Sequence, residues 1–466
     1  MTGVRKYGLL GAAVFSITLL GCVDEQIVYR DKPLFEDPPA NAVGFLGYSN
    51  VDTKQTTCGN CHAGQQVAWK ESEHADAWAT LQANPNKADY CNDCHTVSGN
   101  GNVTQGETLV AYAATKDPRY QDVQCESCHG GGLEHVTNPS NFQPKASILT
   151  ASDATNGCGE CHSDTHHPFV EEWENSRHGE VTPSLLSRTD AEFASCAYCH
   201  EAKAALKTQF GVTAEYAEKD GTTRHGITCA VCHDPHGSEN PAQLRADPFT
   251  RNVEDNLCMK CHHKRAEYED NGRGAHSPQG QLLLGENVGW RPPNFVLGEE
   301  AVYGTHASSN NPELCAGCHI NKFNVTDKAT GAFVMTSTGH QFQAIPCVDA
   351  NGQPTPEQNC GELAATRSFK ACTEAGCHGS ETAARSATVT LDMRLTALTN
   401  ELSRLVALVP RTEFVNADGK ITPGEGARFN ASILSGDMSH GVHNPFLLEA
   451  LLQSSINYLK TYYSIQ

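Results

Sequence analysis

A five-residue motif, Cys-x-x-Cys-His, recurs eight times between residues 58 and 319 of this chain. A ninth, wider copy, Cys372-Thr-Glu-Ala-Gly-Cys377-His378, follows nearer the C-terminal end. The motif is typical of c-type haem attachment, in which two thiols bond to the porphyrin and the histidine binds the iron. One copy alone is also compatible with a zinc site, but eight exact copies predict covalently held haem. In the ninth copy, the extra residues must loop out for both sulfurs to reach one ring.

The nine motifs, called anchors 1 to 9 in chain order, predict haem c, about nine groups in all. Their cysteines are the pairs Cys58/Cys61, Cys91/Cys94, Cys125/Cys128, Cys158/Cys161, Cys196/Cys199, Cys229/Cys232, Cys258/Cys261, Cys315/Cys318 and Cys372/Cys377. Their iron-binding histidines are His62, His95, His129, His162, His200, His233, His262, His319 and His378.

Composition supports a chain built around a cofactor rather than around a large apolar core. The 466 residues include 21 cysteines but only 5 methionines, and aromatic residues make up 7%. Length alone suggests about three domains, and covalent haem would supply hydrophobic mass that the side chains lack. The net charge of −20 argues against nucleic-acid binding. The acidity fits either simple solubility or a surface that selects basic or metal-cation partners.

The N-terminal segment indicates export. Arg5 and Lys6 precede an apolar run, residues 7–20, that is too short to span a membrane. The run ends in LLGC at Cys22, which resembles a lipoprotein signal, so we expect a signal peptide over residues 1–21 and a lipid on Cys22. An ordinary secretion signal with an incidental cysteine is the alternative. Because the next residue is not aspartate, we favour an outer-membrane lipoprotein facing the periplasm or the cell surface.

The sequence predicts a mostly α fold, with short helices and loops around stacked haems and a long C-terminal helical pair. Residues 22–56 are polar and contain proline, which is typical of a tether. Anchor spacing lengthens after residue 245, so we expect haem domains over residues 57–245 (anchors 1–6) and 246–380 (anchors 7–9). An apolar stripe from Leu391 to Val409, stopped by Pro410, and a helix over about residues 445–462 predict a helical hairpin within residues 381–466. The hairpin would pack on the haem body or pair subunits.

Two further cysteines, Cys347 and Cys360, belong to no anchor. In an oxidising compartment they are candidates for a disulfide that closes a short loop. Two unpaired thiols are the alternative.

The second axial ligand of each iron decides between electron transfer and substrate chemistry, because chemistry on a small molecule needs an exchangeable position. The chain has 22 histidines, of which nine follow anchors, so enough remain to give every iron two histidines. This ligation predicts low-potential haems. The candidate second ligands are His74, His135, His178, His225, His236, His276, His306, His340 and His443, which leaves His166, His167, His263 and His440 unused.

Several motifs resemble those of known multihaem cytochromes. A frame Trp-x-x-Ser-x-His follows anchors 1 and 4, ending at His74 and His178, and CESCHGGGLEH and HGITCAVCHDPHG surround anchors 3 and 6. The chain thereby resembles the superfamily that includes the tetrahaem cytochrome c-554, hydroxylamine oxidoreductase, the pentahaem nitrite reductase and the octahaem tetrathionate reductases. GVHNPFLLEALLQSSINYL, residues 441–459, is similar to the helix after the haem core of nitrite reductases. The resemblance implies stacked haem pairs and long C-terminal helices.

Two departures from the enzymes of that superfamily favour an electron carrier. Nitrite reductases have a Cys-x-x-Cys-Lys anchor, whereas every anchor here ends in histidine, and no counterpart of the cross-linked tyrosine of hydroxylamine enzymes is identified. The alternatives are a reductase of nitrite, hydroxylamine or sulfur oxyanions with one open haem, first sought at the Cys372–His378 anchor, and a filament subunit. A carrier resembling outer-membrane cytochromes of metal-reducing bacteria implies other redox proteins as partners: periplasmic cytochromes, quinol-oxidising complexes or an outer-membrane conduit. We expect no nucleic acid, a membrane contact through Cys22, and a homodimer or filament through the C-terminal helices.

Overall fold

The computed structural model describes residues 35–102, 109–151, 156–164, 168–268, 272–293, 295–297, 305–361, 366–374, 376–415 and 420–466. The predicted signal peptide, Cys22 and the first part of the predicted tether lie outside the described residues, as do His166 and His167. Within the described ranges, no helix combines the length and the apolar character needed to cross a membrane.

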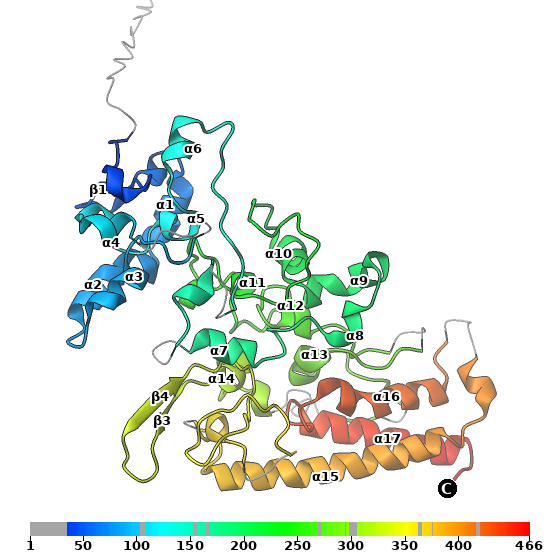
Figure 1. Cartoon of the computed structure of the whole chain (residues 1–466). Helices are drawn as coiled ribbons and strands as arrows, with labels where there is room; N and C mark the ends of the chain where they lie inside the picture. The colour runs from blue at the N-terminus through cyan, green and yellow to red at the C-terminus, as the bar shows by residue number, and fades with distance from the viewer. Residues whose placement is uncertain are drawn as a thin grey trace, which may run out of the picture.

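The described chain is mostly helical, as predicted, and its helices are short except at the C-terminal end (Figure 1). Two antiparallel pairs of short strands, β1 with β2 and β3 with β4, complete it. The α-helices are α1 (Ala63–Lys70), α2 (Ala77–Ala83), α3 (Asn92–His95), α4 (Ala111–Thr115), α5 (Cys125–His129), α6 (Leu133–Thr137), α7 (Phe169–Glu174), α8 (Pro183–Leu186), α9 (Asp190–His200), α10 (Ala202–Phe210), α11 (Cys229–Cys232), α12 (Met259–His262), α13 (Gln279–Leu284), α14 (Leu314–His319), α15 (Glu381–Val406), α16 (Pro423–Asp437) and α17 (Pro445–Tyr462). The strands are β1 (Tyr48–Asn50), β2 (Gln55–Thr56), β3 (Phe323–Thr326) and β4 (Phe333–Ser337).

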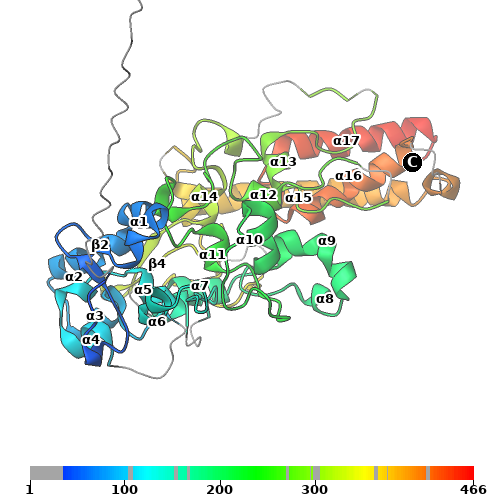
Figure 2. The ribbon, with the colours of Figure 1, turned by 90° about the horizontal axis from the view of Figure 1, so that it is seen from above.

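The molecule is elongated, with its N-terminal elements and its longest helices at opposite ends. Figure 1 places β1 and α1 to α6 at the upper left, α7 to α14 in the middle and α15 to α17 at the bottom, and Figure 2 shows α2 to α4 and α17 at opposite ends. The anchors are distributed along this whole length, because they lie in or beside elements from α1 to the start of α15.

The C-terminal region is a bundle of three helices, not the predicted hairpin. α15 and α17 match the predicted segments, but α16, where no helix was predicted, lies between them in the chain. A capping box starts α16: Thr422 accepts a hydrogen bond from the backbone of Glu425, whose carboxylate accepts one from the backbone of Thr422. Pro423 at the first helical position fits this start, because its missing N–H has no partner to lose there.

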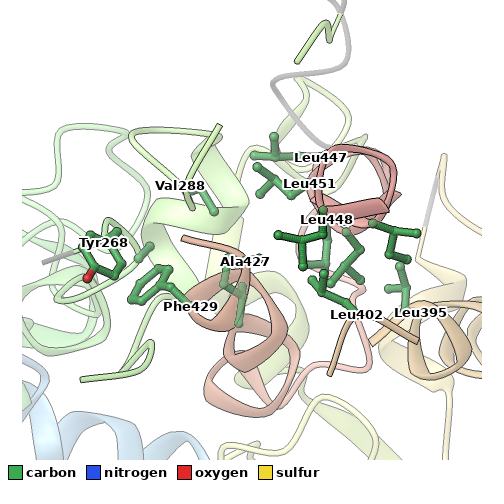
Figure 3. Packing of buried hydrophobic residues seen from close by; sticks show 14 of the residues in the cluster. Tyr268, Val288, Leu395, Leu402, Ala427, Phe429, Leu447, Leu448 and Leu451 are labelled. Atoms are coloured by element: carbon green, nitrogen blue, oxygen red, sulfur yellow. The ribbon is translucent and has the colours of Figure 1, made fainter. Parts of the chain in front are cut away.

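The bundle contains the largest described apolar cluster (Figure 3). Leu395, Leu402 and Leu405 of α15 are fully buried against α17 and α16. The cluster continues into the haem region through Leu282 of α13 and Val288. Each fully buried leucine contributes roughly 1.5–3 kcal/mol to stability. The C-terminal helices therefore pack on the haem body, which was one of the two alternatives predicted from the sequence. Pairing of subunits through these helices stays a prediction.

The segment before the first anchor is packed rather than free, so the prediction of a tether up to residue 56 is wrong for its last part. Ala42, Phe45 and Leu46 are buried, and Tyr48 in β1 hydrogen-bonds Asp122. The sequence of this segment shows no helical pattern and no long strand pattern. It also has few apolar side chains, so its burial could not be predicted from the sequence.

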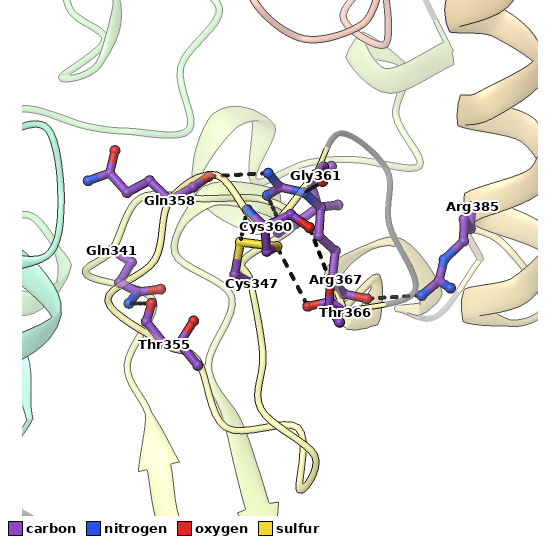
Figure 4. Close-up of a disulfide and its surroundings, with 10 residues drawn as sticks. Gln341, Cys347, Thr355, Gln358, Cys360, Gly361, Thr366, Arg367 and Arg385 are labelled. Atoms are coloured by element: carbon purple, nitrogen blue, oxygen red, sulfur yellow. Dashed lines mark hydrogen bonds between the residues drawn. A yellow bond between two sulfur atoms is a disulfide. The ribbon is translucent and has the colours of Figure 1, made fainter.

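The predicted disulfide between Cys347 and Cys360 is confirmed. The Arg367 guanidinium braces the loop by donating to the carbonyl oxygens of Gly361 at 2.9 Å and Gln358 at 3.2 Å (Figure 4). Arg385 at the start of α15 donates in turn to the Arg367 carbonyl at 3.0 Å. The loop is thereby joined to the bundle.

Candidate haem sites

Each anchor lies in a tight turn or a short helix. At anchor 7, the His262 N–H donates to the Cys258 carbonyl at 2.9 Å, and the same bond closes the turns of anchors 1, 4 and 6. At the wider anchor 9, the His378 N–H donates to the Cys372 carbonyl at 3.0 Å despite the two extra residues. The longer spacer of anchor 9 therefore forms a closed loop, as predicted from the sequence.

Eight anchor histidines face a second histidine ring at nearly constant separation. The ring centres lie 6.0 to 6.4 Å apart in every pair. Numbered by their anchors, the pairs are His62/His135 (site 1), His129/His236 (site 3), His162/His74 (site 4), His200/His276 (site 5), His233/His340 (site 6), His262/His178 (site 7), His319/His443 (site 8) and His378/His306 (site 9).

This separation fits an iron between the rings. Imidazole nitrogens bind metals at about 2 Å, so two opposed rings on one iron have centres roughly 6 Å apart. Direct packing of two imidazole rings gives no reason for one value to recur eight times. The residues present therefore suit haem with two histidine ligands, and the haem would be held by the two cysteines of each anchor.

The second anchor is the one for which this pattern is incomplete. The His95 Nδ1 atom lies 2.9 Å from the Ala77 carbonyl oxygen, which leaves the other ring nitrogen for iron, but no histidine ring opposes it within the described ranges. His225, predicted as a second ligand, does not face an anchor histidine there either. It lies half-buried near Lys203, and the Glu201 carboxylate accepts its backbone N–H. The role of His225 stays a prediction.

Second partners fix the orientation of many rings. The Nδ1 atom of His135 lies 2.7 Å from the Phe142 carbonyl oxygen, and that of His319 lies 2.8 Å from the Phe342 carbonyl oxygen. Such bonds leave Nε2 toward the metal and set the tautomer. His443 differs, because its Nδ1 lies 2.6 Å from a carboxylate oxygen of Asp437.

Electrostatics keep most of these rings neutral, as metal binding requires. Burial, and then the neighbouring His262, lowers the pKa of His178 to about 3. Burial followed by His233 lowers the pKa of His340 to about 4. His443 is the exception: burial alone would lower its pKa, but the charge and hydrogen bond of Asp437 raise it.

Two tryptophan frames dock their histidines in the same way. Trp69 donates to the Val123 carbonyl at 2.8 Å, and the Val123 N–H donates to the His74 carbonyl at 3.1 Å. Trp173 donates to the Ile227 carbonyl at 2.7 Å, and the Ile227 N–H donates to the His178 carbonyl at 2.7 Å. Val123 and Ile227 stand two residues before anchors 3 and 6, so each frame is fastened to an anchor further along the chain.

Contacts between cysteines give the spatial order of the sites. Cysteine side chains of different anchors are close enough to shift each other's pKa at five places: Cys58/Cys125, Cys94/Cys161, Cys158/Cys229, Cys199/Cys261 and Cys258/Cys315. Weaker electrostatic contacts join anchor 3 to 4, anchor 6 to 7 and anchor 8 to 9. Together these contacts order the sites 1–3–4–6–7–8–9, with site 2 beside site 4 and site 5 beside site 7.

Two of the predicted haem-binding cysteines, Cys61 and Cys377, differ from the rest in their surroundings. Both side chains are exposed, whereas the other anchor cysteines are partly buried. This difference was not predicted from the sequence. The physical reason is position: the two cysteines belong to anchors 1 and 9, the ends of the row, where neighbouring anchors lie on one side only. Attachment of haem to Cys61 and Cys377 stays a prediction, and a haem held there would lie close to solvent.

The order of the sites reveals a structural repeat that was not predicted from the sequence. Contacts between anchors 1 and 3, 3 and 4, and 2 and 4 recur between anchors 4 and 6, 6 and 7, and 5 and 7. The recurrence of the tryptophan frame after anchors 1 and 4 was the available signal. Three histidine pairs, at sites 5, 6 and 7, also join residues on the two sides of residue 245, so the two predicted haem domains share their sites.

Two phenylalanines lie between neighbouring pairs in the middle of this order. Phe169 is in edge contact with His162 of site 4 at 6.0 Å and His340 of site 6 at 5.0 Å. Phe342 is in edge contact with His178 of site 7 at 4.4 Å and with His340 at 5.7 Å. Sites 4, 6 and 7 are therefore packed together through aromatic side chains.

Two buried glutamates brace segments that bear second histidines. The Glu126 carboxylate, inside anchor 3, accepts backbone N–H groups of Leu46 at 2.9 Å, Gly47 at 2.7 Å and Gly132 at 2.7 Å. Glu172 of α7 accepts the backbone N–H and hydroxyl of Thr338 and the backbone N–H of His340. No motif in the sequence predicted these two roles.

Comparison with known families finds two local matches. The family described as cytochrome c554 and c-prime matches residues 57–130, which include anchors 1 to 3. A doubled CXXCH motif matches residues 222–267, which include anchors 6 and 7.

Relatives and solved structures extend the similarity. The chain is 26% identical to the multiheme cytochrome MtrA of Shewanella baltica, over 56% of this chain and 76% of that protein. It is 26% identical to the C-type polyheme cytochrome OmcB of Geobacter sulfurreducens, over 56% of this chain but only 35% of OmcB. Its fold is similar to the outer cell wall cytochrome OcwA (TM-score 0.56, 17% identity, 89% of this chain and 100% of OcwA). It is also similar to an undecaheme cytochrome from the S-layer of Carboxydothermus ferrireducens (TM-score 0.53, 19% identity, 91% of this chain and 70% of that one).

Proposed function

We propose that this protein, a multihaem c-type cytochrome by its anchors and relatives, is an electron carrier that moves electrons along about nine low-potential haems. The observation that supports this best is the recurrence of eight opposed histidine pairs, with ring centres 6.0 to 6.4 Å apart. An iron with both axial positions filled by fixed ligands suits electron transfer and leaves no position for a substrate.

Haem supplies reversible one-electron chemistry when it is bound. The chain contributes the rest: cysteines fix each porphyrin, opposed histidines hold each iron, and carbonyl oxygens set the tautomers of the rings. Burial keeps rings such as His178 and His340 neutral. Close contacts between anchors, and the edge contacts of Phe169 and Phe342, keep neighbouring sites near one another.

The order of the sites makes the carrier a branched conductor in this proposal. Sites 1 and 9 are the ends of the main row, while sites 2 and 5 are side branches. Electrons entering at one end would leave at the other, and the branches would offer two more places for exchange with redox partners. The exposure of Cys61 and Cys377 at the two ends supports exchange there.

The setting we propose is respiration that delivers electrons to or beyond the outer membrane. Relatives named as an outer cell wall cytochrome and an S-layer cytochrome support it, as does the predicted export signal. The lipid on Cys22, outer-membrane attachment and redox partners such as periplasmic cytochromes, quinol-oxidising complexes or an outer-membrane conduit belong to the same proposal. So does assembly of copies through the C-terminal helices.

The competing function, reduction of nitrogen or sulfur oxyanions, needs an exchangeable iron position. The wide anchor 9 was the first place to expect one, but His306 faces His378 there at 6.4 Å, which supports the carrier. Low-temperature EPR of the purified haem-loaded protein separates the two. The carrier predicts low-spin ferric signals throughout; a stoichiometric high-spin ferric signal, or nitrite turnover with a reduced dye, would overturn it.

A further inference from the structure

The second histidine of site 8 contacts a buried, uncompensated carboxylate. His443 lies in the turn between α16 and α17, where Asn444 caps α17 and donates to the Leu282 carbonyl at 3.0 Å. Asp437, the last residue of α16, has a fully buried side chain whose Oδ1 lies 2.6 Å from His443 Nδ1. Its other oxygen accepts the Ser439 hydroxyl. Among the described residues, its ion-pair partner is His443 alone.

The other paired histidines with known partners contact neutral or compensated groups. His135 faces a backbone carbonyl, and the nearest ring-nitrogen partner of His340 is the Thr338 hydroxyl at 3.0 Å. His236 does meet a carboxylate, Asp234, but at 3.5 Å and with half of the His236 side chain exposed. The charge of Asp234 is moreover offset by Arg245 at 2.8 Å. Site 8 is therefore distinct in its electrostatics.

A carboxylate on the far nitrogen makes an imidazole a stronger electron donor to the metal that it binds. A buried negative charge also interacts strongly, because little water screens it. Both effects stabilise ferric over ferrous iron. We propose that Asp437 is a positioning residue that holds the potential of site 8 below the value set by two histidines alone.

This inference rests on the proposed function, because it assumes that His319 and His443 share one iron. It deepens that function by giving the row of sites a thermodynamic step. Site 8 stands between site 9 and the other sites, so an electron on either side would meet a less favourable site there. Electrons at site 9 would then exchange less freely with those on sites 1 to 7.

The test compares two matched substitutions in the full-length, haem-loaded protein. Asp437→Asn removes the charge but keeps an oxygen that can accept the His443 N–H. Asp392→Asn makes the same change 2.9 Å from His440 Nδ1, and no described ring contact joins His440 to an anchor histidine. Each variant is titrated spectroelectrochemically and examined by EPR, together with Asp437→Glu, which restores the charge.

We expect one transition of Asp437→Asn to move to higher potential, while its iron stays low-spin. The reduced-to-oxidised ratio of that haem at fixed ambient potential should rise at least tenfold, which is about 59 mV for one electron. Asp392→Asn should move no transition, and Asp437→Glu should recover most of the shift. Unchanged potentials in Asp437→Asn, an equal shift in Asp392→Asn, or a high-spin iron in place of a shift would each overturn the inference. Failure of the proposed function is distinguishable, because the wild-type protein itself would then lack nine low-spin haems.

Discussion

Glu172 offers a direct test of how the fold sets a haem site. Its two oxygens accept three hydrogen bonds: from the Thr338 N–H at 2.8 Å, the Thr338 hydroxyl at 2.7 Å and the His340 N–H at 2.8 Å. These bonds join α7, which follows anchor 4, to the turn that brings His340 opposite His233. Glu172→Gln keeps the volume but turns one acceptor into an amide that faces donors.

The expected cost follows from those contacts. Hydrogen bonds to a charged group contribute about 1.5–3 kcal/mol each, and the amide cannot satisfy one or two of the three buried donors. The free energy of unfolding should therefore fall by roughly 1.5–6 kcal/mol. His340 would also lose its support, so a fraction of site 6 should become high-spin in the ferric state.

The assay is denaturant unfolding of the haem-loaded protein, paired with low-temperature EPR. Glu171→Gln is the matched control, because Glu171 lies next to Glu172 on α7 but its carboxylate, among the described residues, accepts a single hydrogen bond, from the Asp164 N–H at 2.6 Å. Glu171→Gln should lower the free energy of unfolding by less than half as much as Glu172→Gln does. Its ferric haems should all stay low-spin. If Glu172→Gln and Glu171→Gln unfold alike and both keep every low-spin signal, the reasoning that Glu172 supports His340 is refuted.

Two further outcomes follow from the sites. Burial, opposed by the backbone N–H groups of Leu46, Gly47 and Gly132, raises the pKa of Glu126 to about 7. Because this folded-state value is above the unfolded one, the contribution of Glu126 to wild-type stability should fall by about 3 kcal/mol from pH 4 to pH 7, at about 1.4 kcal/mol per unit. Glu126→Gln should lack that fall, and parallel unfolding curves for both proteins across this range would contradict the argument. His276→Ala should convert site 5 to high spin in the ferric state, because His276 faces His200 there; an EPR spectrum in which every haem of this variant stays low-spin would contradict the pairing.

Local chemistry explains what the sequence could predict. The anchors are contiguous, so their turns and the loop of anchor 9 follow from the motif alone. The last helix was predicted at its observed bounds, because Pro445 opens it and leucines mark one face. Cys347 and Cys360 were predicted to pair because the other cysteines had partners in the anchors or at Cys22.

Tertiary contacts explain what the sequence could not predict. The set of second histidines could be proposed from a count, but which ring meets which depends on packing: His74 faces His162 rather than His62. α16 was missed because Gly424, Gly426 and Gly436 weaken its helical pattern. Gly426 is needed where the Trp290 ring lies against the helix, since a Cβ there would come within 2.2 Å of the ring. The capping box of Thr422 and Glu425 was the local signal for α16 that could have been read from the sequence.

A structure of the haem-loaded protein tests the central claim most directly. We expect one iron between the two rings of each pair, from His62/His135 to His378/His306. We also expect neighbouring irons to follow the order 1–3–4–6–7–8–9, with sites 2 and 5 as side branches. Irons bound by other residues, or a different order of neighbours, would contradict the account.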